Sequence, residues 1–494
     1  MTDTRCDLLI VGAGPAGMAA ACEARERGLS VIVADEGHAP GGQIYRDVTT
    51  SPLRSIAALG KDYAAGRPLI ERFFACGAQY LPHTLVWQIG REAHTGATEA
   101  VAMLTRGNAA DAGNAPGLDH ASGTLAVHAR AVLLATGAQE RPWPIRGWTL
   151  PGVMGVGAAQ TALKSAGLVP CAQTVLVGGG PLLWLFTSQL LEAGRRIAAI
   201  VDTTPPDAHT KALRHLPRAL RAADYLLKGW RMMRAVRRAG IAIHHHALDV
   251  EIIGDTRAGA IRFVDGAGNA RQIEASLMLL HQGVIPSTNL ARATGCAHEW
   301  DARTACWHPQ TDAWGRSSVA DVWIAGDGAG IGGAQAAAFA GTLAALDVAA
   351  QLGALDTLTR DRASRAPRAA LNHHLAVRPL LDALYTPPPA SRLPTDEVIV
   401  CRCEEVTAGE IRRIAARGCT GPNQMKAFSR CGMGPCQGRL CGTTVGELIA
   451  HAQARDPADV GYYRIRAPVK PVTIAQLAQA MPVDTDVARG EFPS

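Results

Sequence analysis

The stretch Asp7-Leu-Leu-Ile-Val-Gly-Ala-Gly-Pro-Ala-Gly17 decides the fold of this chain. Its apolar first half is typical of a strand buried on both faces, and three glycines in the spacing Gly-x-Gly-x-x-Gly follow at once. The alanine-rich segment 18–27 then favours a helix, and a second apolar strand over 31–34 ends at Asp35-Glu36. In such a βαβ unit the first glycine makes a tight turn, the second lets the backbone approach a pyrophosphate, and the third lets helix and strand pack closely. The pattern predicts a dinucleotide site with its phosphates at the helix N-terminus and an acid on the ribose; a ligand-free glycine turn is the alternative.

Residues 174–202 repeat this architecture with one departure. A strand meets the turn Gly178-Gly-Gly180, a helix follows, and a second strand ends at Asp202. Leu183 stands where the third glycine belongs, and a side chain there alters the packing of the helix behind the phosphate turn. Asp202 suits a ribose diol and repels a 2′-phosphate, which disfavours NADP. We expect a second nucleotide fold that binds NAD, holds an adenine nucleotide such as ATP as a structural group, or binds nothing.

The cysteines indicate a second kind of chemistry. Of the twelve, five crowd together in two groups after Pro387-Pro-Pro389, namely Cys401, Cys403, Cys431, Cys436 and Cys441, while Cys419 between the groups counts with the scattered cysteines. A Cys-x-Cys pair followed by a glycine-rich loop with further cysteines suits a [2Fe–2S] cluster, because four thiolates hold it and glycines let backbone amides point at sulfur. Both neighbouring pairs in the loop read Cys-x4-Cys, so spacing does not choose between them. Structural zinc and inert buried thiols are the alternatives.

Composition and charge exclude several classes of protein. The 494 residues suffice for about three domains. The net charge of +6 is spread over 49 basic and 43 acidic residues, too diffuse for a nucleic-acid-binding face. No Cys-x-x-Cys occurs in the chain, which excludes a dithiol disulfide reductase. Neither a run of about 18 apolar residues nor a signal peptide is found, so we expect a cytoplasmic protein, with association to the cytoplasmic face of a membrane left open.

Two further segments allow more than one interpretation. Residues 211–238 hold nine Lys or Arg and a single acid, Asp224. Apolar residues recur there at helical spacing: Leu213, Leu216, Leu220, Leu227 and Trp230. They indicate either a core-facing helix with a solvated back or a helix that docks on an acidic partner or anionic lipid. His244-His-His246 has no acidic or thiol neighbour in the sequence, and we expect solvated histidines there.

The N-terminal pattern resembles the flavoprotein superfamily with two dinucleotide-binding domains, of the glutathione-reductase-like kind. The resemblance extends to Pro40-Gly-Gly-Gln43, to the strand before Thr136-Gly137, and to Val322-Trp-Ile-Ala-Gly-Asp327. It implies that one set of residues lines FAD: Gly12, Gly14, Pro15, Ala16, Gly17, Asp35, Glu36, Gly42, Gln43, Val86, Thr136, Gly137, Gly326 and Asp327. It also implies that Gly178, Gly180 and Asp202 lie in the second nucleotide site.

The cysteine segment resembles the bacterioferritin-associated-ferredoxin-like [2Fe–2S] domain. Its relatives carry the loop Gly-Met-Gly-x-Cys-Gln-Gly-x-x-Cys, which corresponds here to Cys436 and Cys441. The resemblance implies that Cys401, Cys403, Cys436 and Cys441 bind the cluster and that Cys431 is a packing thiol.

Nearly the whole chain resembles the electron-transfer subunits of hetero-oligomeric bacterial amino-acid dehydrogenases, which include opine oxidase, hydrogen cyanide synthase and (hydroxy)proline dehydrogenase subunits. Pro40–Arg46, Gly179–Leu183 and Tyr463–Pro471 carry that resemblance. It implies a catalytic β subunit that is itself an FAD protein of the D-amino-acid-oxidase type, and it leaves open a small γ subunit. It also implies an oxidoreductase complex, an acceptor such as a quinone and, in several relatives, an FMN at the subunit interface.

We predict no catalytic residue in this chain, because no acid–base pair or reactive thiol can be placed beside the flavin. Two alternatives stay open: a self-sufficient NADH-dependent ferredoxin or quinone reductase, and an assembly subunit with structural cofactors. The expected architecture is α/β, a two-dinucleotide-domain flavoprotein with a small C-terminal [2Fe–2S] domain. The expected boundaries are 1–150 with 283–350 for the FAD domain, 151–282 for the second nucleotide domain, 351–397 for a helical, Pro-rich linker, 398–450 for the four-cysteine domain, and 451–494 for a tail that packs back on the body.

Overall fold

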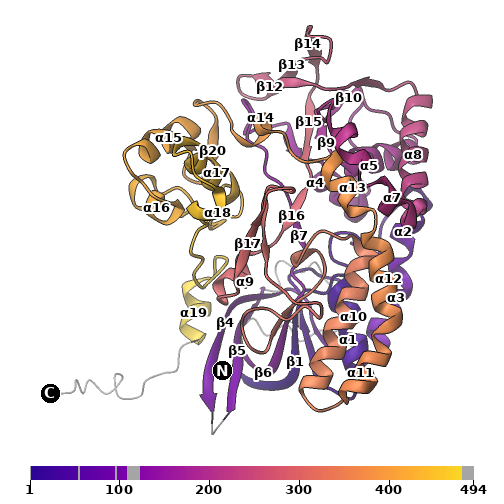
Figure 1. The fold of residues 1–494 in the computed structure, drawn as a ribbon, viewed down its shortest axis with the longest axis vertical. Coiled ribbons are helices and arrows are strands. Elements are labelled where there is room, and N and C mark those ends of the chain that lie inside the picture. Colours follow the sequence, from indigo (N-terminus) through magenta and orange to yellow (C-terminus); the bar gives the residue numbers. More distant parts are fainter. Residues whose placement is uncertain (1, 54–55, 95–96, 108–122, 481–494) are drawn as a thin grey trace, which may run out of the picture.

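The computed structural model of the chain describes residues 2–53, 56–94, 97–107 and 123–480. Its first sheet lies in the lower half of Figure 1. The order across the sheet is β3 (Gln79–Leu81), β2 (Val31–Ala34), β1 (Thr2–Val11), β6 (Thr124–Leu134), β5 (Ala97–Arg106) and β4 (Thr84–His94), with β19 (Val322–Ile324) paired to β6. β1 pairs in parallel with β2 and β6, whereas β4 and β5 are antiparallel. Leu8, Leu9 and Ile10 on β1 are fully buried, as the apolar run predicts.

Helices pack closely over this sheet because small residues lie where the helices meet. α1 (Pro15–Glu26) packs against the long α10 (Ala334–Gln351), and α3 (Gly66–Ala75) packs against α1. A Cβ added at Gly341 of α10 would lie 2.0 Å from the carbonyl oxygen of Ala16, so only glycine permits this approach. The close packing fixes the helix whose N-terminus carries the first glycine turn. Two short elements, η1 (Ile56–Leu59) and α2 (Lys61–Ala64), precede α3.

The second sheet is wholly parallel. Its order is β11 (Ala242–His244), β10 (Ala199–Asp202), β9 (Thr174–Gly179), β15 (Leu277–Gln282) and β8 (Val153–Gly155). Its helices are α4 (Val156–Ala166), α5 (Pro181–Glu192), α6 (Ala208–Leu213), α7 (Leu216–Ala219) with the turn η3 (Leu220–Ala222), and α8 (Ala223–Arg238). An antiparallel sheet of β12 (Leu248–Gly254), β13 (Ala258–Val264) and β14 (Ala270–Glu274) stands at the top of Figure 1. Strands that follow one another through helices in this parallel order form a doubly wound nucleotide fold.

Short antiparallel pairs connect the two sheets. β7 (Ala138–Glu140) pairs with β16 (Val284–Pro286), and β17 (His298–Asp301) pairs with β18 (Cys306–Pro309). α9 (Asn289–Ala293) and η4 (Gly326–Gly328) complete this region. After α10 the chain forms α11 (Thr357–Ala363), α12 (Arg365–Leu375), α13 (Arg378–Leu384) and α14 (Pro389–Arg392). α12 packs on α10, while α13 packs on α6 of the second nucleotide fold, so this helical segment bridges the two.

The cysteine-rich segment forms a small helical unit at the upper left of Figure 1. It contains β20 (Ile399–Cys401), β21 (Val406–Thr407), α15 (Ala408–Ala416), α16 (Pro422–Ser429), α17 (Gly442–Ala452) and α18 (Pro457–Val460). α19 (Ile474–Ala480) then returns to the first sheet, where Thr124 donates to the carbonyl of Gln476. Thr407 caps α15, because its side chain accepts a hydrogen bond from the amide of Glu410.

The predicted fold class is therefore confirmed: two nucleotide folds in an α/β body carry a separate C-terminal unit with the cysteines. Among the described residues, no helix has the length and hydropathy to cross a bilayer.

Candidate functional site

The first glycine turn has the form needed to cradle a pyrophosphate. Gly12 has φ +107°, and a Cβ there would lie 2.4 Å from the carbonyl oxygen of Ala135. A Cβ at Gly17 would lie 1.9 Å from the carbonyl oxygen of Gly12. At Gly14, by contrast, the nearest heavy atom to an added Cβ is 3.9 Å away. The first and third glycines are thus required by the protein itself, while the second leaves room beside the helix N-terminus for a phosphate.

Other residues predicted to line FAD gather around this turn. A Cβ at Gly42 would lie 3.0 Å from the Cα of Gly14, and one at Gly326 would lie 2.8 Å from the Cβ of Ala16. The Thr136 hydroxyl donates to the carbonyl of Ser287, whose amide donates to the carbonyl of Gly137. Segments far apart in the sequence therefore meet at one end of the first sheet. Val86 instead lies buried in β4 with the sheet core.

The two carboxylates of the predicted acidic pair, Asp35 and Glu36, make different contacts. Asp35 accepts hydrogen bonds from the amides of Ala13 and Gly37, at 2.5 and 2.6 Å, which engages both of its oxygens. Burial raises the pKa of Asp35. Glu36 is half-exposed and forms an ion pair with Lys470 of the C-terminal segment. Of the predicted acidic pair, Asp35 is therefore partly buried with both oxygens engaged, while Glu36 is more exposed and paired with Lys470.

Asp327 organises the start of α10. Its Oδ1 accepts from the amides of Gly332 and Gly333, at 2.8 and 2.9 Å. Asp327 is not the N-cap of α10, which is Gly333; its carboxylate instead fixes the loop that leads into the helix. A carboxylate held this way stands next to Gly326, which packs on Ala16 of the first glycine turn.

Lys164 on α4 is a buried cation that no motif predicted. Its side chain is 2% exposed, and its Nζ donates to the carbonyl of Gln43 at 3.0 Å and to Oε1 of Gln160 at 3.1 Å. Burial, with the nearby charge of Arg46, lowers the pKa of Lys164 to about 7. Gln43 belongs to the loop predicted to lie against FAD, so Lys164 is hydrogen-bonded directly to that loop.

Lys164→Met is expected to stabilise the chain at neutral pH. The pKa of Lys164 is about 7 in the fold against an ordinary 10.5, so the unfolded chain binds the extra proton and stability rises as the pH increases from 7 to 10.5. Methionine removes the buried charge, and we expect the free energy of unfolding at pH 7 to increase by ~2 kcal/mol after allowance for the lost hydrogen bonds. Urea unfolding at a series of pH values measures both effects. If the free energy of unfolding of the variant still rises steeply between pH 7 and 10.5, a group other than Lys164 causes the pH dependence.

Several of the protein's own side chains lie close to the second glycine turn. A Cβ at Gly180 would lie 3.1 Å from Nε2 of His281, and one at Gly179 would lie 4.0 Å from the ring of Tyr385, which follows α13. Asp202 is paired with Nδ1 of His245 at 3.0 Å and accepts from the amide of Thr204. His245 is exposed, as predicted, but it has an acidic partner in Asp202 that the sequence did not indicate. Leu183, at the third glycine position, is 1% exposed and packs in the core.

The sulfur atoms of Cys401, Cys431 and Cys441 lie within 4.8 Å of one another, and all three side chains are buried. Cys401 ends β20, while the other two come from the glycine-rich loop. Hydrogen bonds from Cys431 and Cys441 lower the pKa of Cys401 to about 2. Cys403 is exposed and lies within hydrogen-bonding reach of Cys436. Three thiols at this separation can hold a metal ion or an iron–sulfur cluster.

This grouping unites two of the four predicted ligands with the thiol predicted to pack. Cys401 and Cys441 are together, and Cys403 and Cys436 form an adjacent pair nearer the surface. Tyr463, from the tail, donates its hydroxyl to Cys431 at 3.5 Å. A Cβ at Gly432 or Gly438 would lie 2.4 or 2.5 Å from the Tyr463 ring, so the loop glycines make space for this ring. The tail motif therefore shapes the cysteine loop.

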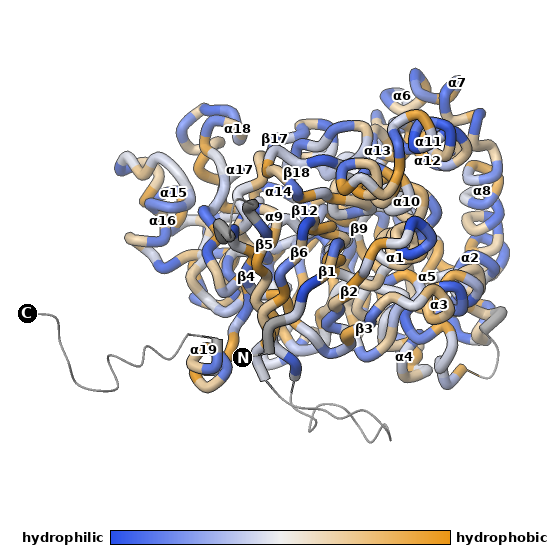
Figure 2. The backbone as a smooth tube through the Cα atoms, turned by 90° about the horizontal axis from the view of Figure 1, so that it is seen from below, coloured by the Kyte–Doolittle hydropathy of each residue, from blue (hydrophilic) through white to orange (hydrophobic). Residues whose placement is uncertain are grey.

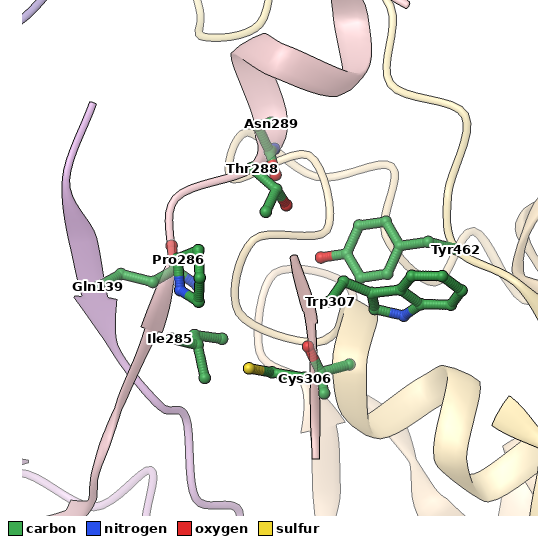
Figure 3. A pocket seen from close by; sticks show the side chains of 9 residues that line it. Gln139, Ile285, Pro286, Thr288, Asn289, Cys306, Trp307 and Tyr462 are labelled. Atoms are coloured by element: carbon green, nitrogen blue, oxygen red, sulfur yellow. The ribbon is translucent and has the colours of Figure 1, made fainter. Parts of the chain in front are cut away.

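The cysteine loop is bonded directly to the segment that carries Thr136 and Gly137. Gln139 donates from Nε2 to the carbonyl of Arg439 at 2.8 Å, and Asn289 donates to the carbonyl of Gln437 at 3.3 Å. Figure 3 shows a small cavity at this junction, where Gln139 and Tyr462 approach from opposite sides. Its volume of about 10 Å³ has room for one water and none for an amino acid.

Cys306 points into the same cavity (Figure 3) and is 3.3 Å from Nε2 of His308. Although burial opposes ionisation, the hydrogen bond and charge of His308, with the charge of Arg141, lower the pKa of the Cys306 thiol. This buried thiol–imidazole pair was not predicted, because its residues form no motif in the sequence.

Together, the nucleotide turns and the cysteine unit define an oxidoreductase of the two-nucleotide-domain flavoprotein class with an added cysteine domain. A family model described as pyridine nucleotide-disulphide oxidoreductase matches residues 6–341, and one described as sarcosine oxidase A3 domain matches residues 396–480. The A subunit of opine oxidase from Agrobacterium tumefaciens (strain Ach5) is 46% identical over 96% of this chain and 91% of that protein. The chain belongs to the family of opine oxidase A subunits.

Two other proteins are similar to this chain. Hydrogen cyanide synthase subunit HcnB of Pseudomonas aeruginosa is 31% identical over 94% of this chain and 96% of that protein. The crystal structure of L-proline dehydrogenase from P. horikoshii has a TM-score of 0.64 at 17% identity, over 97% of this chain and 80% of that one, and shows the shared fold. The curated relatives are named as subunits of multisubunit enzymes.

Proposed function

We propose that this chain is the electron-transfer subunit of a hetero-oligomeric, FAD-dependent dehydrogenase for an amino acid, an opine or (hydroxy)proline. A separate β subunit of the D-amino-acid-oxidase type would oxidise the substrate, and a quinone or another acceptor would receive the electrons. We extend the proposal to an FMN at the subunit interface, as in the family resemblance, and leave room for a small γ subunit.

Two cofactors fit the residues of this chain. FAD would lie on the Gly12–Gly17 turn with its ribose at Glu36, and a [2Fe–2S] cluster would lie between the cysteines of residues 401–441. When bound, the flavin exchanges electrons in pairs or singly and the cluster exchanges one at a time, which needs rigid positions and no general acid or base. Gly14 supports the first assignment, since its open side has room for a phosphate. The three thiols within 4.8 Å support the second.

The hydrogen bonds between Gln139 and Arg439 and between Asn289 and Gln437 carry this proposal. Gln139 stands two residues after Gly137, and Asn289 stands two residues after Ser287, the partner of Thr136. The loop between Cys436 and Cys441 is thus fixed to the segment proposed to face the flavin. Two redox groups held in this way would exchange electrons over a short, rigid path.

We further propose that NADH is not the electron donor. A dinucleotide at the second turn would need the carboxylate of Asp202, which is paired with His245, and the space beside Gly179, which faces Tyr385. Leu183 replaces the third glycine there. We keep an adenine nucleotide with a structural role as the alternative for this domain.

Dye-linked turnover tests the proposed division of labour. The purified chain alone is expected to reduce an artificial acceptor dye with none of proline, hydroxyproline, glycine, an opine or NADH, because we assign no substrate-oxidising site to the residues that the structure describes. Addition of the partner flavoprotein should produce turnover with one substrate of the amino-acid class. Dye reduction by the lone chain with an amino acid, or with NADH, would place the donor site in this chain and contradict the proposal.

A further inference from the structure

A basic and partly apolar surface runs along the outer edge of the second nucleotide fold. We call it the basic edge and define it by its exposed side chains: Leu213, Arg218, Leu220, Arg221, Leu227, Trp230, Arg231, Arg234, Arg237 and Arg238. The four large apolar side chains among them are between 45% and 61% exposed. The interpretation in which they face the core is therefore wrong: Leu216 alone of the five predicted apolar positions is half-buried.

α8 shows how this surface arises. Its inward face buries Val236 and packs Met232 and Met233 against the core. The opposite face carries Leu227, Trp230, Arg231, Arg234 and Arg238, which follow one another at helical spacing in a single stripe. The helix thus has two apolar faces of different kinds. One face packs against the core, and the other exposes leucine and tryptophan together with arginine at the surface.

The charges of the basic edge are not neutralised within the chain. Lys211 pairs with Asp207 and Lys228 pairs with Asp62 at its border. In the part of the chain that the structure describes, no carboxylate forms an ion pair with any of six arginines: Arg218, Arg221, Arg231, Arg234, Arg237 and Arg238. The guanidinium of Arg234 lies 5.0 Å from the centre of the Trp230 ring. Six such cations in one strip attract a surface that is uniformly negative.

We propose that the basic edge binds the surface of an anionic phospholipid bilayer. Arginines interleaved with leucine and tryptophan along one helix stripe suit the bilayer interface, where the cations meet lipid phosphates and the apolar side chains enter the acyl boundary. α8 lies on the outer edge of the molecule in both Figure 1 and Figure 2, opposite the cysteine unit, so the whole stripe can lie flat on a membrane. That arrangement leaves the cysteine side free for the partner subunit.

The proposal depends on this surface alone and extends the proposed function, since a quinone acceptor resides in the bilayer. An acidic protein face is the competing occupant. The exposed Leu213, Leu220, Leu227 and Trp230 favour lipid, because they stand beside arginines that have no ion-pair partner among the described residues, so apolar side chains and cations can meet the acyl boundary and the phosphates together.

Vesicle co-sedimentation of the full chain tests this proposal. Vesicles of phosphatidylglycerol and phosphatidylcholine in equal parts should bind the protein, and pure phosphatidylcholine vesicles should not. The triple variant Arg231→Glu, Arg234→Glu, Arg238→Glu should bind the anionic vesicles at least ~10-fold more weakly. The matched control Arg257→Glu, Arg413→Glu, Arg417→Glu changes the net charge equally at exposed positions elsewhere and should bind as the wild type does.

Circular dichroism and thermal unfolding establish that both triple variants are folded. In addition, the difference in tryptophan emission between the wild type and Trp230→Phe should shift to the blue when anionic vesicles are added. Equal weakening by the control variant, or no binding of the wild type to anionic vesicles, would overturn the proposal. If the wild type does not bind the vesicles and the triple variant no longer binds the partner subunit, the basic edge is a protein interface. None of these readouts depends on turnover, so their failure is distinguishable from failure of the proposed function.

Discussion

Cys401→Ser and Cys441→Ser should each remove the iron and acid-labile sulfide of the purified chain, by more than ~10-fold. Both thiols belong to the predicted ligand set, and the structure places them together in a buried group. A serine hydroxyl in this interior is a poor replacement for a thiolate. Iron and sulfide analysis, with visible absorbance, measures the loss.

Cys431→Ser and Cys436→Ser form the matched pair that decides the fourth ligand. The loop resemblance predicts that Cys436 binds, and Cys436 lies beside Cys403 near the surface, where the two can close over a cluster seated on Cys401 and Cys441. We expect the cluster absorbance to survive Cys431→Ser and to disappear in Cys436→Ser. The reverse result would make the buried group of Cys401, Cys431 and Cys441 the core of the site. One equivalent of zinc without iron would refute the cluster altogether.

Gly14→Val should lower the affinity for FAD by at least ~100-fold while the chain remains folded. The nearest heavy atom to a Cβ at this position is 3.9 Å away, and the backbone has φ −75° and ψ −176°, which valine adopts readily. A phosphate at the helix N-terminus would meet the added methyl groups. Gly17→Ala provides the contrast, because its Cβ would lie 1.9 Å from the carbonyl oxygen of Gly12 and should destabilise the fold as well.

Flavin absorbance after gel filtration and thermal unfolding of the flavin-free protein separate these two variants. Asp327→Ala tests the other half of the same site, where the carboxylate holds the amides of Gly332 and Gly333. Full flavin occupancy in both Gly14→Val and Asp327→Ala would show that the cofactor lies elsewhere.

The fold could be predicted from the sequence because its main signals are local patterns. The strand, glycine turn and acid of residues 7–36 fall within one βαβ unit, so the spacing along the chain reports the geometry directly. The same holds for the turn at Gly178 and for the cap at Thr407. Such patterns could not predict how the contacts of Asp35 and Glu36 differ. That depends on which of the two accepts the hydrogen bonds from the amides of Ala13 and Gly37.

Apart from the local pair of Cys306 and His308, the unpredicted features arise from contacts between distant segments. Lys164 sits at a position where a helix commonly exposes a lysine, and only the packing of α4 on the Gln43 loop buries it. His245 meets Asp202 across the ends of two parallel strands. Cys431 joins Cys401 because Tyr463 orders the loop from another part of the chain. Spacing within one segment contains no information about such pairs.

Electron paramagnetic resonance of the assembled complex tests the central claim most directly, that electrons from the partner's substrate reach the cysteine domain of this chain. The complex is mixed with its amino-acid-class substrate without oxygen and frozen. We expect the signal of a reduced [2Fe–2S] cluster in the complex with the wild-type chain, and no signal with the Cys441→Ser chain or without the partner subunit. A fully reduced partner flavin with no cluster signal in the wild-type complex would contradict the account.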